Sequence, residues 1–476
     1  MRKLSAGVVV WLALFGLFVE AQTLGTLIVR VVSDGQPVEH AEVRVGTVEG
    51  QTDARGEVTL RVATGRQEVV VERFGFESAK APATVDPAAE TRVTIELEAE
   101  AVLTENVVVT ATRTTQRIQD LPLRVEVVPQ EEIDEKLSMT PGDVAMMLTE
   151  TNGLRVQVTS PSTGAATVRV QGLRGRYTQV LSDGLPLYGQ SGSISILQIP
   201  PMDLGQVEVI KGVASALYGG AALGGVINLV SRRPRADHPE REILVNRTSL
   251  GGTDAALWLS QKGKGQWGYT FLGGTHWQDR QDVNDDGWTD IAKYQRVVAR
   301  PRLVWENGAG RSLFMTTGAL VEDREGGTVA GAVAPDGAPF AEEIRTSRFD
   351  AGLVGRFVLG GSRVFTLRVS GLGLNHRHQF GESRERDFHH TFSSEASLNG
   401  VNGRHTWVAG ASFQQDGYRS QDLPAFDYRY VTPAIFVQDD YAPAPWLTAS
   451  ASGRLDFHNQ FGTFFSPRVS ALAKLP

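Results

Sequence analysis

The sequence predicts a mainly β protein of several domains, and three observations support that fold class. Residues 24–98 alternate short β-branched runs with turn residues, as expected for a small β-sandwich. Residues 113–234 combine strand patterns, one helical pattern and many glycines, which favours a compact α+β domain. Residues 235–476 read as about twelve amphipathic strands, which favours the first part of a transmembrane antiparallel β-barrel.

The bulk composition excludes several classes of function. The 476 residues allow about two to four domains, and the formal net charge is −7 without any long basic run, so nucleic-acid binding is not expected. Cysteine is absent, which excludes disulfides and thiolate metal sites. Arg2 and Lys3 precede an apolar run at 6–19, which predicts a signal peptide over residues 1–21. The alternative is an N-terminal anchor helix, but the run is shorter than the ~20 residues that span a bilayer.

The segment 22–98 has strand patterns at 27–32, 41–45 and 68–71 with turn residues between them. The turn and strand residues that matter for its classification are Gly35, Pro37, Ala41, Thr52, Asp53, Gly56, Gly65, Gly75 and Phe76. Their order resembles the carboxypeptidase regulatory-like domain. Zinc-ligand spacing is not found, so a peptidase activity is not expected.

The segment 113–234 is rich in tight turns. A helix is predicted over Ser138–Leu148, with Thr140 as its cap and Pro141 at its first position. Apolar strand patterns end in glycine or in Asp-Gly, where a positive φ is easily accommodated. The motif residues are Gln171, Gly172, Asp183, Gly184, Lys211, Gly212, Tyr218, Gly219, Gly224, Gly225 and Asn228.

These motifs strongly resemble the plug domain of TonB-dependent outer-membrane receptors. One position departs from the pattern, because the family usually has Arg-Gly where this chain has Gln171-Gly172. Arg169 and Arg174 lie nearby, but neither occupies that position, so the family's arginine role is not transferred. The alternative is an ordinary soluble α/β domain, which would leave the amphipathic segment after it unexplained.

The linker 99–112 contains a short β-branched run that would be an exposed edge without a partner. The run resembles a Ton box, which adds as a strand to the periplasmic protein TonB, and β-augmentation suits such a role. Its residues are Glu105, Asn106, Val107, Val108, Val109, Thr110 and Ala111. The alternative is the first strand of the plug domain.

The segment 235–476 alternates short and long connections between its predicted strands. Long loops are expected at 278–292, 323–343, 376–387 and 416–429, and short turns at 262–265, 307–310, 360–361, 399–403 and 442–445. Short periplasmic turns and long extracellular loops are typical of outer-membrane barrels. Tyr269, Phe271 and Trp277 share one face of a strand, as lipid-facing residues would. The resemblance implies a barrel of about twenty-two strands, so the chain is expected to be an incomplete gene product or an N-terminal fragment.

The acidic loop at 282–290 is a candidate calcium site. Asp282, Asn284, Asp286 and Asp290 offer oxygens at alternate positions, as in the first half of an EF-hand loop. The twelfth position of an EF-hand loop normally carries a glutamate that binds calcium through both oxygens, but here it is Lys293. A solvated acidic loop without any ion is the alternative.

Four histidines flank the predicted loop 376–387. His376 and His378 stand on one side of the loop and His389 and His390 on the other, so they are candidates for a transition-metal or haem site. The alternative is four solvated side chains. A nucleophile–base pair cannot be argued from spacing, and no phosphate-binding glycine loop has the required context, so an enzyme is not expected.

The resemblance implies a receptor for energised uptake of a scarce solute across the outer membrane of a Gram-negative bacterium. Its implied partners are TonB with the inner-membrane energising complex, outer-membrane lipid and a small-molecule solute. The N-terminal domain and Ton box would lie in the periplasm, and no cofactor would be required apart from possible loop calcium. A ferric siderophore or other metal chelate is the favoured solute. The alternatives are an oligosaccharide receptor, a non-transporting structural or adhesion protein, and a secreted enzyme.

Overall fold

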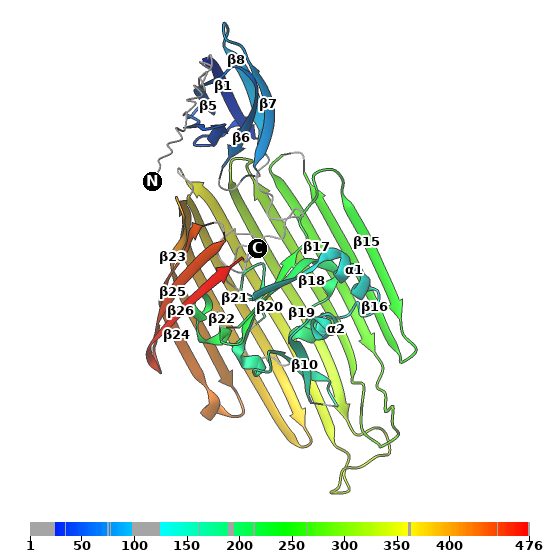
Figure 1. Ribbon diagram of the computed structural model, residues 1–476. Helices are drawn as coiled ribbons and strands as arrows, with labels where there is room; N and C mark the ends of the chain where they lie inside the picture. Colours follow the sequence, from blue (N-terminus) through cyan, green and yellow to red (C-terminus); the bar gives the residue numbers. More distant parts are fainter. Residues whose placement is uncertain are drawn as a thin grey trace, which may run out of the picture. The chain divides into compact units, whose positions relative to one another are not determined.

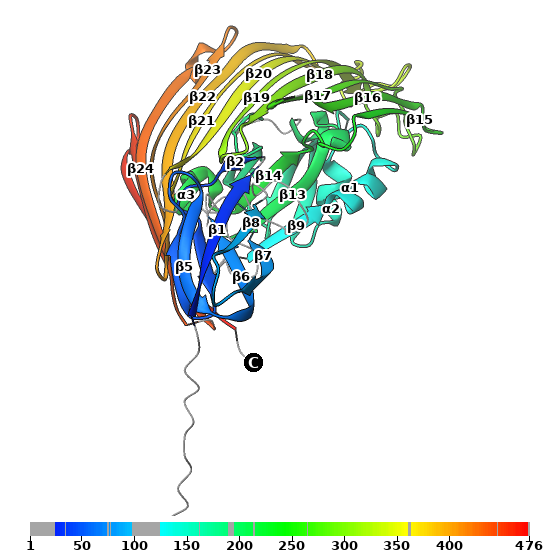
Figure 2. The same cartoon turned by 90° about the horizontal axis from the view of Figure 1, so that it is seen from above.

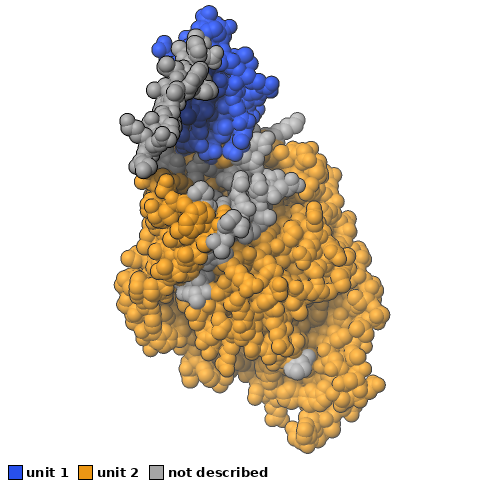
Figure 3. Space-filling model, in the orientation of Figure 1, with its two compact units in different colours: residues 1–73, 77–97 blue, residues 74–76, 98–476 orange. Residues whose placement is uncertain are grey.

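The fold was derived from a computed structural model. It describes residues 24–474 except 34, 74, 75, 77, 98–123, 161, 189–194, 213, 214, 264, 360–362 and 445. The predicted signal peptide (1–21) and Ton box (105–111) lie outside the described residues and stay predictions. The chain divides into two compact units, residues 1–73 with 77–97 and residues 74–76 with 98–476 (Figure 3). Among the described residues, no helix combines the length and apolar character needed to cross a membrane.

The N-terminal unit is the predicted β-sandwich. One sheet contains β1 (Leu24–Ser33), β2 (Gln36–Pro37), β5 (Glu57–Ala63) and β8 (Thr91–Glu96). The other contains β3 (Glu42–Val45), β4 (Val48–Gln51), β6 (Gly65–Glu72) and β7 (Ala79–Val85). Alternate residues of β1, such as Leu27 and Val29, are fully buried, and Val43 and Val69 are buried in the other sheet. This period of two places one face of each sheet in the core between them.

The second unit begins with an α+β domain at residues 124–232, here called the middle domain. Its main sheet has the order β12-β14-β13-β9, with β12 parallel to β14, and a separate hairpin pairs β10 with β11. The strands are β9 (Arg124–Pro129), β10 (Leu154–Ser160), β11 (Ala165–Val170), β12 (Thr178–Ser182), β13 (Leu204–Lys211) and β14 (Gly225–Ser231). The helices are α1 (Gln130–Leu137), α2 (Ala145–Glu150) and α3 (Ser215–Tyr218), and the 3-10 turns are η3 (Gly175–Tyr177), η4 (Ser195–Gln198), η5 (Pro201–Asp203) and η6 (Gly220–Ala222).

The helix predicted over Ser138–Leu148 is wrong in its first half. Helix α2 begins only at Ala145, where the Asp143 carboxylate accepts the backbone N–H at 2.9 Å. Pro141 and Gly142 lie in the preceding turn, and the Gly142 carbonyl accepts a hydrogen bond from Arg296 of a distant strand. A tertiary contact has therefore replaced the intrahelical bond that the local sequence favours.

The rest of the second unit is a twelve-stranded antiparallel sheet in sequential order from β15 to β26. It curves around the middle domain, which lies against its concave face (Figures 1 and 2). The strands are β15 (Glu240–Arg247), β16 (Gly252–Lys262), β17 (Trp267–Gln278), β18 (Lys293–Glu306), β19 (Arg311–Gly327), β20 (Ala341–Leu359), β21 (Arg363–Phe380), β22 (Ser383–Asn402), β23 (His405–Ser420), β24 (Tyr428–Ala444), β25 (Leu447–His458) and β26 (Gly462–Ala473); η7 (Pro424–Phe426) precedes β24.

Several predicted loops are shorter than expected because the strands continue into them. The predicted loop 376–387 is instead a hairpin, with β21 and β22 paired up to the Phe380–Ser383 step. The loops predicted at 323–343 and 416–429 shrink to 328–340 and 421–427. The longest connections, 279–292 and 328–340, nevertheless share one edge of the sheet, here called the loop edge. A strand needs about 9–11 residues to cross a bilayer, so β20 to β23 extend well beyond that length.

The two faces of the sheet differ in chemistry. Alternate residues that point away from the middle domain are apolar and exposed; Val245, Val297 and Val469 are 73%, 58% and 84% exposed. Trp267 and Trp305 pair at 6.5 Å beside the short turns, and Tyr269 and Trp277 of the same face are also exposed. A water-soluble protein rarely exposes such a continuous apolar face, whereas a lipid-facing barrel wall requires one.

Candidate functional site

The turn motifs of the middle domain occupy the left-handed region of backbone conformation. The φ values of Gln171 and Gly172 are 49° and 82°, and those of Asp183 and Gly184 are 51° and 75°. Glycine and aspartate tolerate this region better than most residues, whereas glutamine does so at a cost. Gln171, which stands where the family usually has arginine, is therefore a strained residue at the start of the tight turn after β11.

A buried polar network links the Asp-Gly turn to the end of the domain. The Gly184 N–H donates to Asn228 Oδ1 at 2.8 Å, and Asn228 Nδ2 donates to Glu208 Oε2 at 2.9 Å. The Asp183 carboxylate accepts hydrogen bonds from the Ser231 backbone at 3.1 Å and hydroxyl at 2.8 Å. Glu208 and Asn228 are fully buried, so removing one partner would leave a charged or polar group unsatisfied.

The Lys-Gly and Gly-Gly motifs meet across two strands. Lys211 of β13 pairs with Gly225 of β14, and the Gly212 N–H donates to the Gly224 carbonyl at 3.2 Å. The Lys211 ammonium forms an ion pair with Glu126 of β9. The structure thus brings these motif residues into one corner of the sheet, where they fix its register.

The Tyr-Gly motif of the middle domain lies against the twelve-stranded sheet. Leu217 packs with Val408 of β23 and Phe436 of β24, and Tyr218 packs against the same cluster. Arg454 of β25 donates to the Leu217 carbonyl at 3.0 Å. The motif therefore anchors the middle domain to the later strands of the sheet.

Arginines of the sheet form the other main contacts with the middle domain. Arg296 donates to the carbonyls of Gly142, at 2.9 Å, and Leu197. Two further arginines repeat the pattern: Arg302 pairs with Asp203 at 2.5 Å, and Arg324 donates to the Thr163 carbonyl at 2.9 Å. These arginines were not among the predicted site residues. Their signal in the sequence is that Arg296, Arg300 and Arg302 alternate with apolar residues in one strand, which places them on one face.

Acidic and aromatic groups complete this interface. Glu342 of β20 accepts hydrogen bonds from Ser162 and from Ser160, the latter at 2.7 Å. Arg300 binds Asp350 through two bonds of 2.7 and 2.9 Å and stacks over the Tyr188 ring at 5.7 Å. The contacts between the two parts thus include many polar ones, beside apolar clusters such as Met202 with Trp258 and Leu272. Each polar contact can be exchanged for a bond to water more easily than an apolar core can be separated.

Arg296→Ala is expected to loosen the middle domain. The side chain is fully buried, and its loss removes donors to two carbonyls and one partner of Glu322, which lies at 3.5 Å. The expected cost is about 3 kcal/mol, typical of one partner lost from a buried charged pair. Protease cleavage within 138–144 in detergent measures the effect. The control is Arg345→Ala, whose exposed pair with Asp323 at 3.7 Å should not matter; equal cleavage in both variants would contradict the expectation.

The acidic loop at 282–290 uses its carboxylates within the loop. Asp282 accepts the backbone N–H groups of Asp286 at 3.2 Å and Gly287 at 2.9 Å. Asp290 accepts the Val283 N–H at 2.8 Å. Asn284 donates to Asp286 at 3.1 Å. The side chains hold the loop in shape, and calcium binding there stays a prediction.

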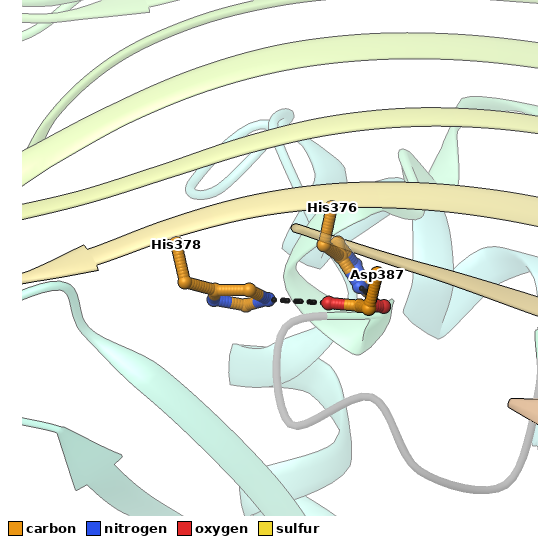
Figure 4. Close-up of side chains that lie close together, drawn as sticks. All are labelled: His376, His378 and Asp387. Atoms are coloured by element: carbon orange, nitrogen blue, oxygen red, sulfur yellow. Dashed lines mark hydrogen bonds and ion pairs between the residues drawn. The ribbon is translucent and has the colours of Figure 1, made fainter. Parts of the chain in front are cut away.

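The histidines near the loop edge separate into two groups. His376 and His378 of β21 share the inward face with Asp387 of β22, and the three ligand atoms lie within 4.8 Å of one another (Figure 4). His389 instead pairs with Asp416 at 2.5 Å, and His390 lies on the other face, stacked on Phe388. The four histidines therefore do not converge on one point, contrary to one option left open by the sequence.

The same edge is tied together by an exposed ion pair. Arg386 donates to Asp422 with its guanidinium at 2.7 Å and its backbone N–H at 2.7 Å. These bonds hold the pKa of Asp422 below its usual value. They connect the tip of β22 with the loop 421–427, next to the inward-facing histidines.

Family comparisons agree with this arrangement. Residues 117–226 match the TonB-dependent receptor plug domain, and residues 26–98 match the carboxypeptidase regulatory-like domain. The chain carries the plug domain of TonB-dependent receptors. The middle domain is accordingly called the plug domain from here on.

Relatives of the whole arrangement are receptors and transporters. The ferrioxamine receptor of Yersinia enterocolitica is 29% identical over 244 residues, covering 50% of this chain and 32% of the receptor. The vitamin B12 transporter BtuB of Photobacterium profundum is 32% identical over 187 residues, covering 39% of this chain and 27% of the transporter. The ferric enterobactin receptor of Pseudomonas aeruginosa superposes with a TM-score of 0.61 at 15% identity, over 77% of this chain and 61% of that receptor.

These matches establish the fold of the plug domain and the surrounding sheet. The matched part of the chain spans 32% and 27% of the length of these two curated relatives. The plug domain itself accounts for the glycine-rich turns, because its strands must pack closely against an enclosing wall.

Proposed function

We propose that this protein is an outer-membrane receptor that takes up a scarce solute with energy supplied through TonB. The observation that carries the proposal is the plug domain seated by polar contacts on the inward face of a sheet whose outward face is apolar. A plug blocks passive diffusion, so passage of solute requires the plug to be remodelled. Transport of this kind needs no covalent chemistry, and none is proposed.

The mechanism follows from the character of the interface. Solute binds at the loop edge and at the adjacent part of the plug domain. Residues 105–111 then pair with TonB as an added strand, and force generated by the proton-motive force acts on the plug through the main chain. Because separate hydrogen bonds and ion pairs join the plug domain to the twelve-stranded sheet, water can replace these bonds one at a time. The N-terminal domain and residues 105–111 would face the periplasm.

A ferric siderophore or another metal chelate is the proposed solute. The relatives named as ferrioxamine and ferric enterobactin receptors and as a vitamin B12 transporter all handle metal complexes by name. Inward-facing aromatic side chains near the loop edge provide a surface for the apolar parts of such a ligand. They are Tyr418, Tyr428, Tyr430, His458 and Phe461, with neighbouring rings 4.4–5.8 Å apart.

Uptake by whole cells tests this proposal. Cells that lack their own siderophore receptors would express the protein and receive iron-55 complexes of hydroxamate and catecholate chelators, labelled cobalamin, and labelled oligosaccharides. Accumulation of at least one metal complex is expected, and it should disappear with an uncoupler or without TonB. Energised uptake of oligosaccharides alone would contradict the proposed solute class. Binding without energised uptake of any solute would contradict transport and favour a structural role.

A further inference from the structure

The tips of β21 and β22 bring two histidines and one carboxylate together on the inward face. His376 Nδ1 lies 3.3 Å from Asp387 Oδ1, and His378 Nε2 lies 3.4 Å from Asp387 Oδ2. We propose that His376, His378 and Asp387 form a binding site for one divalent first-row transition-metal ion. The proposal does not depend on the uptake function, because binding can be measured on the isolated protein without TonB.

The backbone fixes the relative positions of the three side chains. His376 lies directly opposite Asp387 in the ladder, and His378 lies opposite Glu385. Residues two apart in a strand point to the same face, and directly opposed residues have Cβ atoms about 4.5–5.5 Å apart. The pairing continues to the turn at Gly381, so both strands are held by main-chain hydrogen bonds at this point. The site is therefore preorganised on a rigid hairpin and does not depend on a mobile loop.

The distances between the ligand atoms suit a metal ion. Bonds from zinc to imidazole nitrogen or carboxylate oxygen are about 2.0–2.1 Å, which gives an edge of about 3.3 Å between two ligands of a tetrahedron. The two histidine–aspartate separations, 3.3 Å to Oδ1 and 3.4 Å to Oδ2, are close to that edge, and all three ligand atoms lie within 4.8 Å of one another. The His376–Asp387 contact is also a hydrogen bond, but at 3.3 Å it is longer than a charge-assisted one, which is about 2.7–2.9 Å. His389 and Asp416, at 2.5 Å, show what a direct contact looks like one strand away.

The environment of Asp387 supports the same conclusion. Its side chain is only 4% exposed, whereas His376 and His378 are 18% and 22% exposed. Within the described part of the chain, its polar partners are these two imidazoles. Among the described residues, no lysine or arginine forms an ion pair with this carboxylate. A bound divalent ion would supply the missing positive charge and two strong ligand bonds to the imidazoles.

The ligand set also selects the class of ion. Two imidazoles and one carboxylate suit zinc, cobalt, nickel or copper, whereas calcium and magnesium prefer all-oxygen sites. Three protein ligands leave at least one coordination position open for water or an external ligand. Leu372 and Leu374 of β21 are buried on the same face of the strand as His376 and His378. The open coordination position of the metal would therefore face the side of the sheet on which the plug domain lies.

Cobalt titration of the untagged, intact protein in detergent tests the site. Tetrahedral cobalt(II) has intense visible absorption, and zinc competition then ranks the ions. One cobalt ion per chain is expected to bind, and zinc but not calcium should displace it. The excess calcium also fills any calcium site at 282–290, so that cobalt does not bind there. His376→Ala, His378→Ala and Asp387→Asn should each weaken binding by at least about tenfold.

His405→Ala is the matched control. His405 forms a single pair with Asp439 at 2.8 Å on the same sheet and is half exposed, so its loss should leave cobalt binding unchanged. Resistance of each variant to heat unfolding in detergent verifies that the sheet is intact. Wild-type protein that gives no saturable cobalt absorption would overturn the proposal, as would unchanged affinity in all three ligand variants. If the protein bound cobalt normally but took up no solute, the proposed transport function would be contradicted and the metal site would stand.

Discussion

Deletion of residues 105–111 is expected to abolish energised uptake and to leave solute binding at the cell surface unchanged. The segment is the predicted Ton box, and it is separate in sequence from the plug contacts and the loop edge that would bind the solute. Without a strand for TonB to pair with, force cannot reach the plug domain. Accumulation of a labelled metal complex over time, compared with binding at 4 °C, measures the two effects separately. Accumulation that continues at the normal rate would exclude this segment from energy coupling.

Single substitutions distinguish main-chain pairing from side-chain recognition. Proline lacks the N–H that a paired strand donates, so Val107→Pro or Val108→Pro should stop uptake, whichever of the two faces TonB. Val107→Ala and Val108→Ala keep the backbone donors and should retain most of the uptake. If alanine and proline variants behaved alike, recognition would depend on the valine side chains and not on β-augmentation.

The strands of the sheet and their exposed face could be predicted because contact with lipid imposes a strict pattern. Residues such as Tyr269 and Trp277 alternate with inward residues wherever a strand crosses an apolar layer, and the structure places both on the exposed face. The pattern fails beyond that layer. At 376–387 the residues on both faces of the strands are polar, so apolar and polar residues no longer alternate. For this reason a loop was predicted where the structure has a paired hairpin.

The candidate site was predicted only as a set of residues. The motifs identified Asp183, Gly184 and Asn228, but not the bonds that join them through Glu208. Contacts between the wall and the plug domain link residues that are more than a hundred positions apart, such as Arg296 and Gly142. Local sequence carries no register for such pairs. The pairing of His376 with Asp387 could not be predicted either, because it depends on the turn between β21 and β22, which was not recognised in the sequence.

Gly225→Ala is expected to unfold the plug domain while the outer sheet stays folded. Gly225 has φ +142°, and a Cβ at this position would lie 2.2 Å from the backbone oxygen of Ile210 in the neighbouring strand. A backbone oxygen in a paired strand cannot rotate away, so β13 and β14 would have to separate. Backbone strain and overpacking together should cost roughly 3–5 kcal/mol. Protease sensitivity of the plug domain reports this loss.

Gly212→Ala separates the two causes, because Gly212 shares a positive φ with Gly225 but not the clash. Its φ is +97°, and nothing lies within 4 Å of the added Cβ, so only the conformational cost of about 1–3 kcal/mol applies. The expected order of plug stability is wild type, then Gly212→Ala, then Gly225→Ala. If both variants lost the same stability, the close approach of β13 and β14 would not be what requires glycine at 225. The Gly-Gly motif would then serve backbone conformation alone, and its place at the corner with Lys211 would carry no packing constraint.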